Sequence, residues 1–235
     1  PIKRRGVKSD YEGEGAAAEY HFVLEKGEKE RLDDFLKERR VTLAAVFYCA
    51  WGLLLQRYCN SGDVVFGTTV SGRSAPLNGI ENMVGLFINT IPLRMTTGPG
   101  EKIKDLAERI NHILAIREEY EGASLVDIKE YSELQNNREL FDSIVVLENY
   151  PLDRRLMKEN SQLPLVVESY SIVESTPYPL TVSITTSEVI EIRFIFDSLL
   201  FENEPLSRLV SHFNTILTSI IENFDKDIRC IELLT

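Results

Sequence analysis

An apolar helical pattern at residues 42–58 constrains the fold of this sequence more than any other feature. Thr42 can cap the helix, because its hydroxyl can accept a backbone N–H that the first turn leaves unpaired. Apolar side chains recur at spacings of three and four, and others lie off that stripe, so the helix must be buried on most sides. The stripe is Leu43, Val46, Phe47, Ala50, Trp51, Leu54 and Tyr58, and the apolar residues off it are Ala44, Ala45, Leu53 and Leu55.

The rest of the chain supplies strands and helices to surround this element. Their order shows neither strict βαβ alternation nor an internal repeat of fixed period. This predicts the fold class α/β, with a mixed sheet covered by helices. We expect strands at 19–24, 63–70, 87–93, 142–147, 165–172, 178–185 and 189–196, and helices around 32–36, at 103–114, at 124–128 and from 205 to 224.

Length and composition favour one globular domain. The 235 residues are 43% hydrophobic and 27% charged, which is ordinary for a globular protein with a sizeable core. The first eighteen residues mix basic residues, glycines and alanines without periodicity, so we expect a linker at 1–18 and a domain at 19–235. The chain has no run of eighteen apolar residues and no signal-peptide pattern at its start, which predicts a cytoplasmic protein.

Charge and cysteine spacing argue against several classes of partner. The net charge of −11 would repel nucleic-acid phosphates and anionic membranes, so neither is expected to bind. Cys49, Cys59 and Cys230 show no CxxC spacing. We therefore expect three reduced thiols and no metal site.

The histidines lack the sequence context of a catalytic base. His21, His112 and His212 have no nucleophile, carboxylate or second histidine placed beside them, and each is expected at the surface. The motifs of serine hydrolases, nucleotide-binding proteins and zinc proteases are absent from the sequence as well. The residues alone assign no catalytic chemistry.

Two apolar stretches carry residues that a simple core does not require. The first contains Gly67 and ends on Ser-Gly-Arg at 71–73, and the second places Asn89 within an apolar strand. A strand glycine often marks close approach by another chain or ligand, and a buried amide needs partners. The alternative is that Gly67 sits at a β-bulge, Asn89 satisfies neighbouring backbone, and Arg73 and Arg94 are solvated.

These stretches resemble the condensation domains of nonribosomal peptide synthetases. The matching sequences are Asp-Val-Val-Phe-Gly-Thr-Thr-Val-Ser-Gly-Arg at 63–73 and Glu-Asn-Met-Val-Gly-Leu-Phe-Ile-Asn-Thr at 81–90. The similarity extends to the helix at 41–58 and to residues 140–151, and covers nearly everything from 19 to 224. It implies the C-terminal lobe of a two-lobe domain, each lobe having a chloramphenicol acetyltransferase-like fold.

The resemblance also implies an activity for the parent domain. In the family, an HHxxxDG motif at the end of the N-terminal lobe supplies a histidine that helps an acceptor amine attack a donor thioester, which forms a peptide bond in antibiotic biosynthesis. This sequence has no His-His pair. We expect it to contribute no catalytic residue and to be inactive alone.

Two alternatives to this interpretation remain open from the sequence. One is the C-terminal lobe of an epimerization domain, and the other is an interaction lobe with no role in catalysis. The patterns at 83–90 and 147–151 favour a condensation domain over an epimerization domain.

The resemblance further implies the residues that line a substrate tunnel. Asn89 takes the place of the asparagine in the family's Gly-x-Phe-Val-Asn-Thr pattern, where an amide can orient a carbonyl or an amine without titrating. A bridging loop is expected at about 71–86, and a crossover segment between 150 and 185. The implied tunnel residues are Ser71, Arg73, Gly85, Phe87 and Asn89.

The partners implied by the resemblance are protein domains. They are the N-terminal lobe of the same domain, the donor and acceptor peptidyl carrier proteins, and the neighbouring adenylation domain. No cofactor is expected to bind directly, because the substrates arrive on the phosphopantetheine arms of the carrier proteins.

Overall fold

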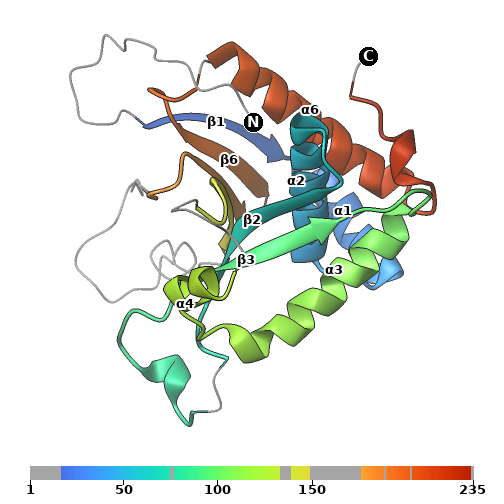
Figure 1. Cartoon of the computed structure of the whole chain (residues 1–235). Helices are drawn as coiled ribbons and strands as arrows, with labels where there is room; N and C mark the ends of the chain where they lie inside the picture. Colours follow the sequence, from blue (N-terminus) through green and yellow to red (C-terminus); the bar gives the residue numbers. More distant parts are fainter. Residues whose placement is uncertain are drawn as a thin grey trace, which may run out of the picture.

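A six-stranded mixed sheet forms the centre of the computed structural model, which describes residues 17–74, 77–132, 139–148, 176–187, 189–201 and 203–233. The strand order is β1-β6-β5-β4-β2-β3 (Figure 1). Strand β4 pairs in parallel with β2 and β5, and the other neighbours are antiparallel. The predicted mixed α/β fold is confirmed. The strands are β1 Ala17–Leu24, β2 Asp63–Val70, β3 Asn89–Thr96, β4 Ser143–Glu148, β5 Leu180–Thr186 and β6 Ile190–Asp197.

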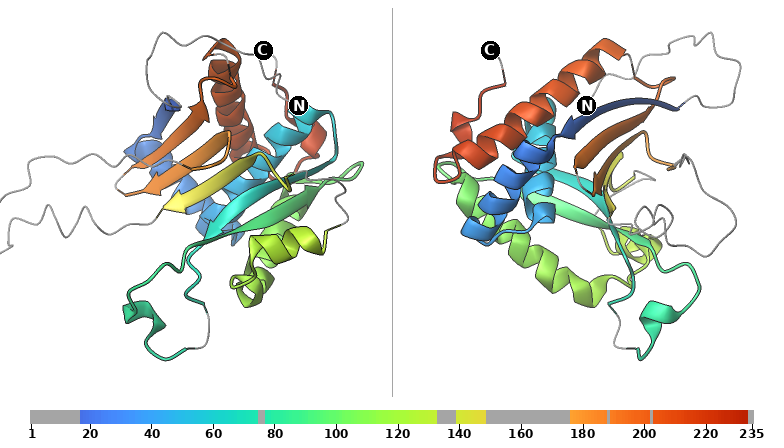
Figure 2. Two further views of the ribbon diagram at one scale, coloured as in Figure 1. Left: turned by 60° about the vertical axis from the view of Figure 1, so that its left-hand side comes forward. Right: turned by 180° about the vertical axis from the view of Figure 1, so that it is seen from behind.

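The long helices cover one face of this sheet (Figures 1 and 2). They are α1 Lys26–Arg39, α2 Leu43–Cys59, α3 Ile103–Arg117 and α6 Asn203–Glu222, with a short α4 at Leu125–Glu130 and 3-10 turns η1 Ile80–Asn82, η2 Glu118–Tyr120 and η3 Ile228–Cys230. In the described part of the chain no single helix is long and apolar enough to cross a membrane, while α1 and α2 pass this test only as a pair bent by 102°.

Helix α2 lies in the centre of the core, as its sequence predicts. Thr42 caps it by accepting the backbone N–H of Ala45 at 3.2 Å. Trp51 is fully buried, and its ring centroid lies 6.3 Å from those of Phe194 in β6 and Phe213 in α6. Its indole nitrogen donates to the hydroxyl of Ser143 in β4 at 3.3 Å, which satisfies the polar atom of an otherwise apolar contact. This helix therefore joins the sheet to α6.

Several predicted boundaries differ from the structure, and one predicted strand cannot be compared with it. Strand β1 begins at Ala17, before the expected start at 19, because β6 extends to Asp197 and offers backbone partners to Ala17 and Ala18. The strand expected at 87–93 is displaced to β3, which begins where Asn89 pairs with the last residue of β2. The predicted strand at 165–172 lies outside the described residues.

The β-bulge considered at Gly67 is absent. Gly67 pairs in continuous register with Pro92 of β3 and with Ile144 of β4. A Cβ atom at this position would lie 2.4 Å from the ring of Phe141 and 2.6 Å from Cγ2 of Ile144. The glycine is thus required by close side-chain packing on the sheet.

We expect Gly67→Ala to lower the free energy of unfolding by roughly 1–3 kcal/mol, because the added methyl overpacks the sheet. Chemical denaturation measures the loss, and the second substitution Phe141→Leu should recover part of it. Gly27→Ala in α1 is the control, since a Cβ there has open space around it. Equal stability of Gly67→Ala and the wild type would contradict this account.

Candidate functional site

Four of the five predicted site residues lie in the loop that joins β2 to β3. Ser71, Arg73, Gly85 and Phe87 belong to this loop, of which residues 71–74 and 77–88 are described. The fifth, Asn89, is the first residue of β3. In Figure 2 the loop extends well away from the sheet and helices. The structure thus brings the predicted residues to one end of the β2–β3 pair.

Arg73 binds across the base of this loop. Its guanidinium donates to the carbonyl oxygens of Ile80 and Met83, the latter at 3.1 Å. The same group lies over the ring of Phe87, 4.2 Å from the centroid. The interpretation of Arg73 as a solvated side chain is therefore wrong. Arg94, by contrast, is exposed and pairs with Asp63 at 2.6 Å.

Close approach of two backbone segments explains Gly72. Its φ of +64° is in the left-handed region. A Cβ atom on Gly72 would lie 1.8 Å from the carbonyl oxygen of Phe87, so the two ends of the loop touch only because this residue has no side chain. Gly85 lies close to the same residue, since a Cβ there would be 3.2 Å from the Phe87 ring.

The loop presents large apolar side chains to solvent. Val84 and Leu86 are 103% and 93% exposed. Leu77, Met83 and Ile88 are exposed as well. We call these five residues, which are spread over 77–88, the loop tip. Several large apolar side chains exposed on one loop favour an interaction site.

The Asn89 amide makes three hydrogen bonds to backbone. Its Nδ2 donates to the carbonyl oxygens of Glu121 at 2.9 Å and Ala123 at 2.8 Å, and its Oδ1 accepts the N–H of Thr90 at 2.8 Å. Ser74 of the loop also donates to the Glu121 carboxylate at 2.7 Å. Asn89 therefore fastens the start of β3 to the turn before α4, as the alternative interpretation of its pattern supposed.

A polar cluster on the sheet face opposite the long helices was missed in the sequence. Glu148 of β4 is buried and accepts from the hydroxyl groups of Ser183 at 2.7 Å and Thr185 at 3.3 Å. A guanidinium nitrogen of Arg193 lies 3.8 Å from this carboxylate, and Arg193 Nε is buried without a partner. The signals in the sequence were Glu148, directly after the strand expected at 142–147, and Arg193 within the strand expected at 189–196.

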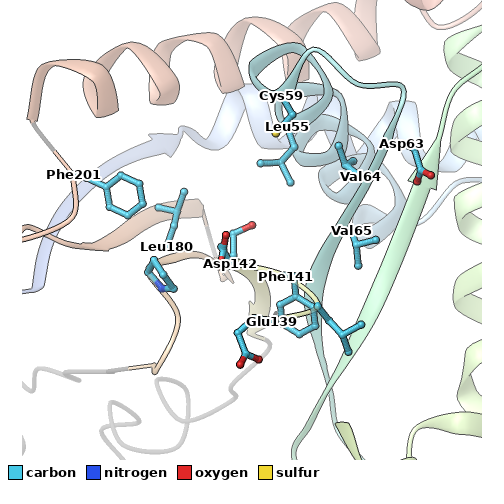
Figure 3. A pocket seen from close by; sticks show the side chains of 13 residues that line it. Leu55, Cys59, Asp63, Val64, Val65, Glu139, Phe141, Asp142, Leu180 and Phe201 are labelled. Carbon is cyan, nitrogen blue, oxygen red and sulfur yellow. The ribbon is translucent and has the colours of Figure 1, made fainter. Parts of the chain in front are cut away.

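A cavity of about 330 Å³ lies at the opposite end of the sheet from the loop. Figure 3 shows Leu55 and Cys59 of α2 facing Leu180 and Phe201 across it, with carboxylates of Asp63, Glu139 and Asp142 at its edges. Asp63 is bound by Arg94, which lowers its pKa, and Glu139 is bound by Lys129 at 2.9 Å. None of the five predicted site residues lines this cavity.

The histidines and thiols have ordinary environments. His21 and His112 are exposed as predicted, whereas His212 is half-buried and its Nδ1 lies 3.0 Å from the hydroxyl of Tyr58. Cys49 is buried, which raises the pKa of its thiol, and Cys59 and Cys230 are exposed and free. Among the described residues, no group of three or more histidine, cysteine or carboxylate side chains is placed to hold a metal ion.

Comparison with known proteins identifies relatives of nearly the whole chain. A family model described as "Condensation domain" matches residues 4–235. Tyrocidine synthase 2 of Brevibacillus parabrevis is 35% identical over 92% of this chain, and gramicidin S synthase 2 of Brevibacillus brevis is 31% identical over 93%. The chain spans only 6% and 5% of the lengths of these two proteins.

Solved structures share the fold. A four-domain nonribosomal peptide synthetase bound to AMP and glycine matches all of this chain with a TM-score of 0.82 at 15% identity, over 18% of its own length. The starter condensation domain of rhizomide synthetase matches with a TM-score of 0.75 at 18% identity, and this chain spans 52% of it. From its sequence match and its fold together, the chain belongs to the condensation-domain family of nonribosomal peptide synthetases.

Proposed function

We propose that this chain is the C-terminal lobe of a condensation domain and forms one wall of the tunnel in which peptide bonds are made. The acceptor amine, carried by one peptidyl carrier protein, attacks the thioester carbonyl of the donor on another. The new C–N bond replaces the C–S bond, and the thiol of the donor phosphopantetheine arm leaves. The histidine that assists this attack belongs to the N-terminal lobe.

The observation that carries this proposal is the loop tip. Val84 and Leu86 have almost no protein contact, although the loop that carries them is held by several specific bonds at its base. Apolar side chains on an ordered support favour a partner surface, and interfaces between domains commonly bury about 600–1,500 Å². We propose a second lobe as that partner, since the chain spans 52% of a solved condensation domain and the rest of such a domain is available to cover the loop tip.

The proposal also includes the tunnel residues, the protein partners and the compartment expected from the sequence. Ser71, Arg73, Gly85, Phe87 and Asn89 lie together at the end of the β2–β3 pair, which supports a role for this region in lining the tunnel. The proposed partners are the donor and acceptor carrier proteins and the adjoining adenylation domain. The proposed compartment is the cytoplasm, where aminoacyl adenylation and thioester formation have their substrates.

Amide formation by separated lobes tests this proposal. We expect no product when the chain is mixed with carrier proteins loaded with aminoacyl thioesters, and product when a separately expressed N-terminal lobe with an intact HHxxxDG motif is added. Mass spectrometry of the carrier-bound product is the measurement. Turnover by the chain alone would contradict the proposal, and inversion of the donor stereocentre in place of amide formation would assign the lobe to an epimerization domain.

The loop tip should determine association with the N-terminal lobe. We expect Leu86→Ser or Val84→Ser to raise the dissociation constant at least about tenfold, because each buried aliphatic side chain contributes roughly 1.5–3 kcal/mol. Leu199→Ser is the control, since Leu199 is exposed at the opposite end of the sheet, in the turn after β6. Sedimentation velocity measures the association. Equal binding by all three variants would show that the loop tip is not the interface.

Substitution of Asn89 should lower the free energy of unfolding. Asn89→Ala leaves two carbonyl groups and one N–H without their side-chain partner at a half-buried position, so we expect a loss of about 1 kcal/mol. Asn89→Asp should cost more at neutral pH, because a carboxylate would then face the carbonyl oxygens of Glu121 and Ala123.

The pH dependence of Asn89→Asp gives a second check. The two carbonyl groups favour the protonated acid, so the pKa of the new carboxyl should be higher in the folded than in the unfolded state. The stability deficit relative to wild type should therefore shrink as the pH falls through that raised pKa. Urea denaturation between neutral and acidic pH measures it, and a deficit independent of pH would exclude the contacts described above.

A further inference from the structure

We infer that Arg73 is a positioning residue, which fixes the described loop residues 71–74 and 77–88 in the shape that presents the loop tip, and that it does so through directed bonds rather than through its charge. The inference rests on the proposed function only for the identity of the partner lobe. The order that Arg73 imposes on the loop is a property of this chain by itself.

The hydrogen bonds of Arg73 join the base of the loop to its centre. One guanidinium nitrogen, Nη1, donates to the carbonyl oxygens of both Ile80 and Met83. These two residues belong to the 3-10 turn η1 and its end, where the N–H of Met83 also donates to the carbonyl of Ile80 at 3.2 Å. The carbonyl of Met83 lies beyond the last hydrogen bond of this turn, so the bond from Arg73 satisfies it and holds Met83 immediately before Val84.

The ring of Phe87 stacks on the same guanidinium. Its centroid lies 4.2 Å from Arg73 Cζ, within the distance at which a cation is attracted to the face of an aromatic ring. Phe87 is half-buried, while its neighbours Leu86 and Ile88 are exposed. The ring thus turns back onto Arg73, and the residues beside it point outward.

Gly72 contributes through the backbone. We call Gly72, Arg73 and Phe87, together with the bonds from Arg73 to Ile80 and Met83, the clasp. Only a residue without Cβ allows the Phe87 carbonyl oxygen to approach as it does, and the left-handed φ of Gly72 directs Arg73 across the loop. The sequence Ser-Gly-Arg at one end of the loop and Phe87 at the other therefore act together to hold the loop in one conformation. The clasp lies in the loop, outside the apolar core.

A clasp of this kind serves binding. Ordering a loop on association costs conformational entropy, and a loop ordered beforehand avoids that cost. Lysine cannot replace arginine here, because it lacks the planar group that stacks on the ring while donating in fixed directions. A residue that served only to place a positive charge in the tunnel would tolerate this replacement.

Hydrogen exchange on the isolated chain tests the clasp directly. In Arg73→Lys and Arg73→Met, we expect the amides of Ile80, Asn82 and Met83 to exchange at least about tenfold faster, since those amides donate within the loop. The melting temperature should change little. Gly72→Ala, which keeps Arg73, should have the same effect on exchange. Arg94→Lys, at the other end of the β2–β3 pair, is the matched control and should leave loop exchange unchanged.

Association with the N-terminal lobe separates the clasp from the proposed function. We expect Arg73→Lys to weaken binding at least about tenfold, while Arg94→Lys binds as wild type. Loop exchange in Arg73→Lys equal to that of wild type, or full binding by this variant, would overturn the inference. If faster exchange is found but the wild-type chain binds no N-terminal lobe, the proposed function fails and the clasp stands.

Discussion

The burial of helix α2 is the constraint on which the rest of the structure depends. A helix that is apolar on most sides needs a sheet beneath it and other helices beside it, and β4, β6 and α6 all meet at Trp51. Strands β2, β4 and β5 run parallel in the centre of the sheet, and Trp51 of this helix bonds to Ser143 of β4 there. The antiparallel strands β1 and β3 then form the edges.

The two ends of strand β2, which follows α2, adjoin two different surfaces. Strand β2 begins at Asp63, beside a cavity with acidic edges, and ends at Val70, about 23 Å away, where the loop departs. At the first end the charges are compensated within the chain, by Arg94 on Asp63 and by Lys129 on Glu139. At the second end apolar side chains have no cover. The second surface is the one that we propose to bind the N-terminal lobe.

The hydrogen-bonded residues around the loop act by fixing backbone. Asn89 and Ser74 connect segments distant in sequence, whereas Arg73 connects residues within the loop, and most of the partners of these three residues are carbonyl oxygens. In the proposed function, a wall built in this way contributes shape to a tunnel and leaves proton transfer to a histidine of the N-terminal lobe. On that proposal, the motif residues of this lobe are specific to the family without being catalytic.

Local patterns in the sequence determined the helices, most strands, the Thr42 cap and the family, because periodicity, capping and motif order are contained within short stretches of chain. They also placed Ser71, Arg73, Gly85, Phe87 and Asn89 in one region. What each residue contacts was decided by tertiary structure: Asn89 meets Glu121 and Ala123, Gly67 meets Phe141, and Glu148 lies near Arg193. Each of these contacts joins residues at least 32 positions apart, and no local pattern encodes such a distance. Whether a polar residue in an apolar strand binds substrate, backbone or another side chain depends on which strands become neighbours, and that is fixed only when the sheet assembles around α2.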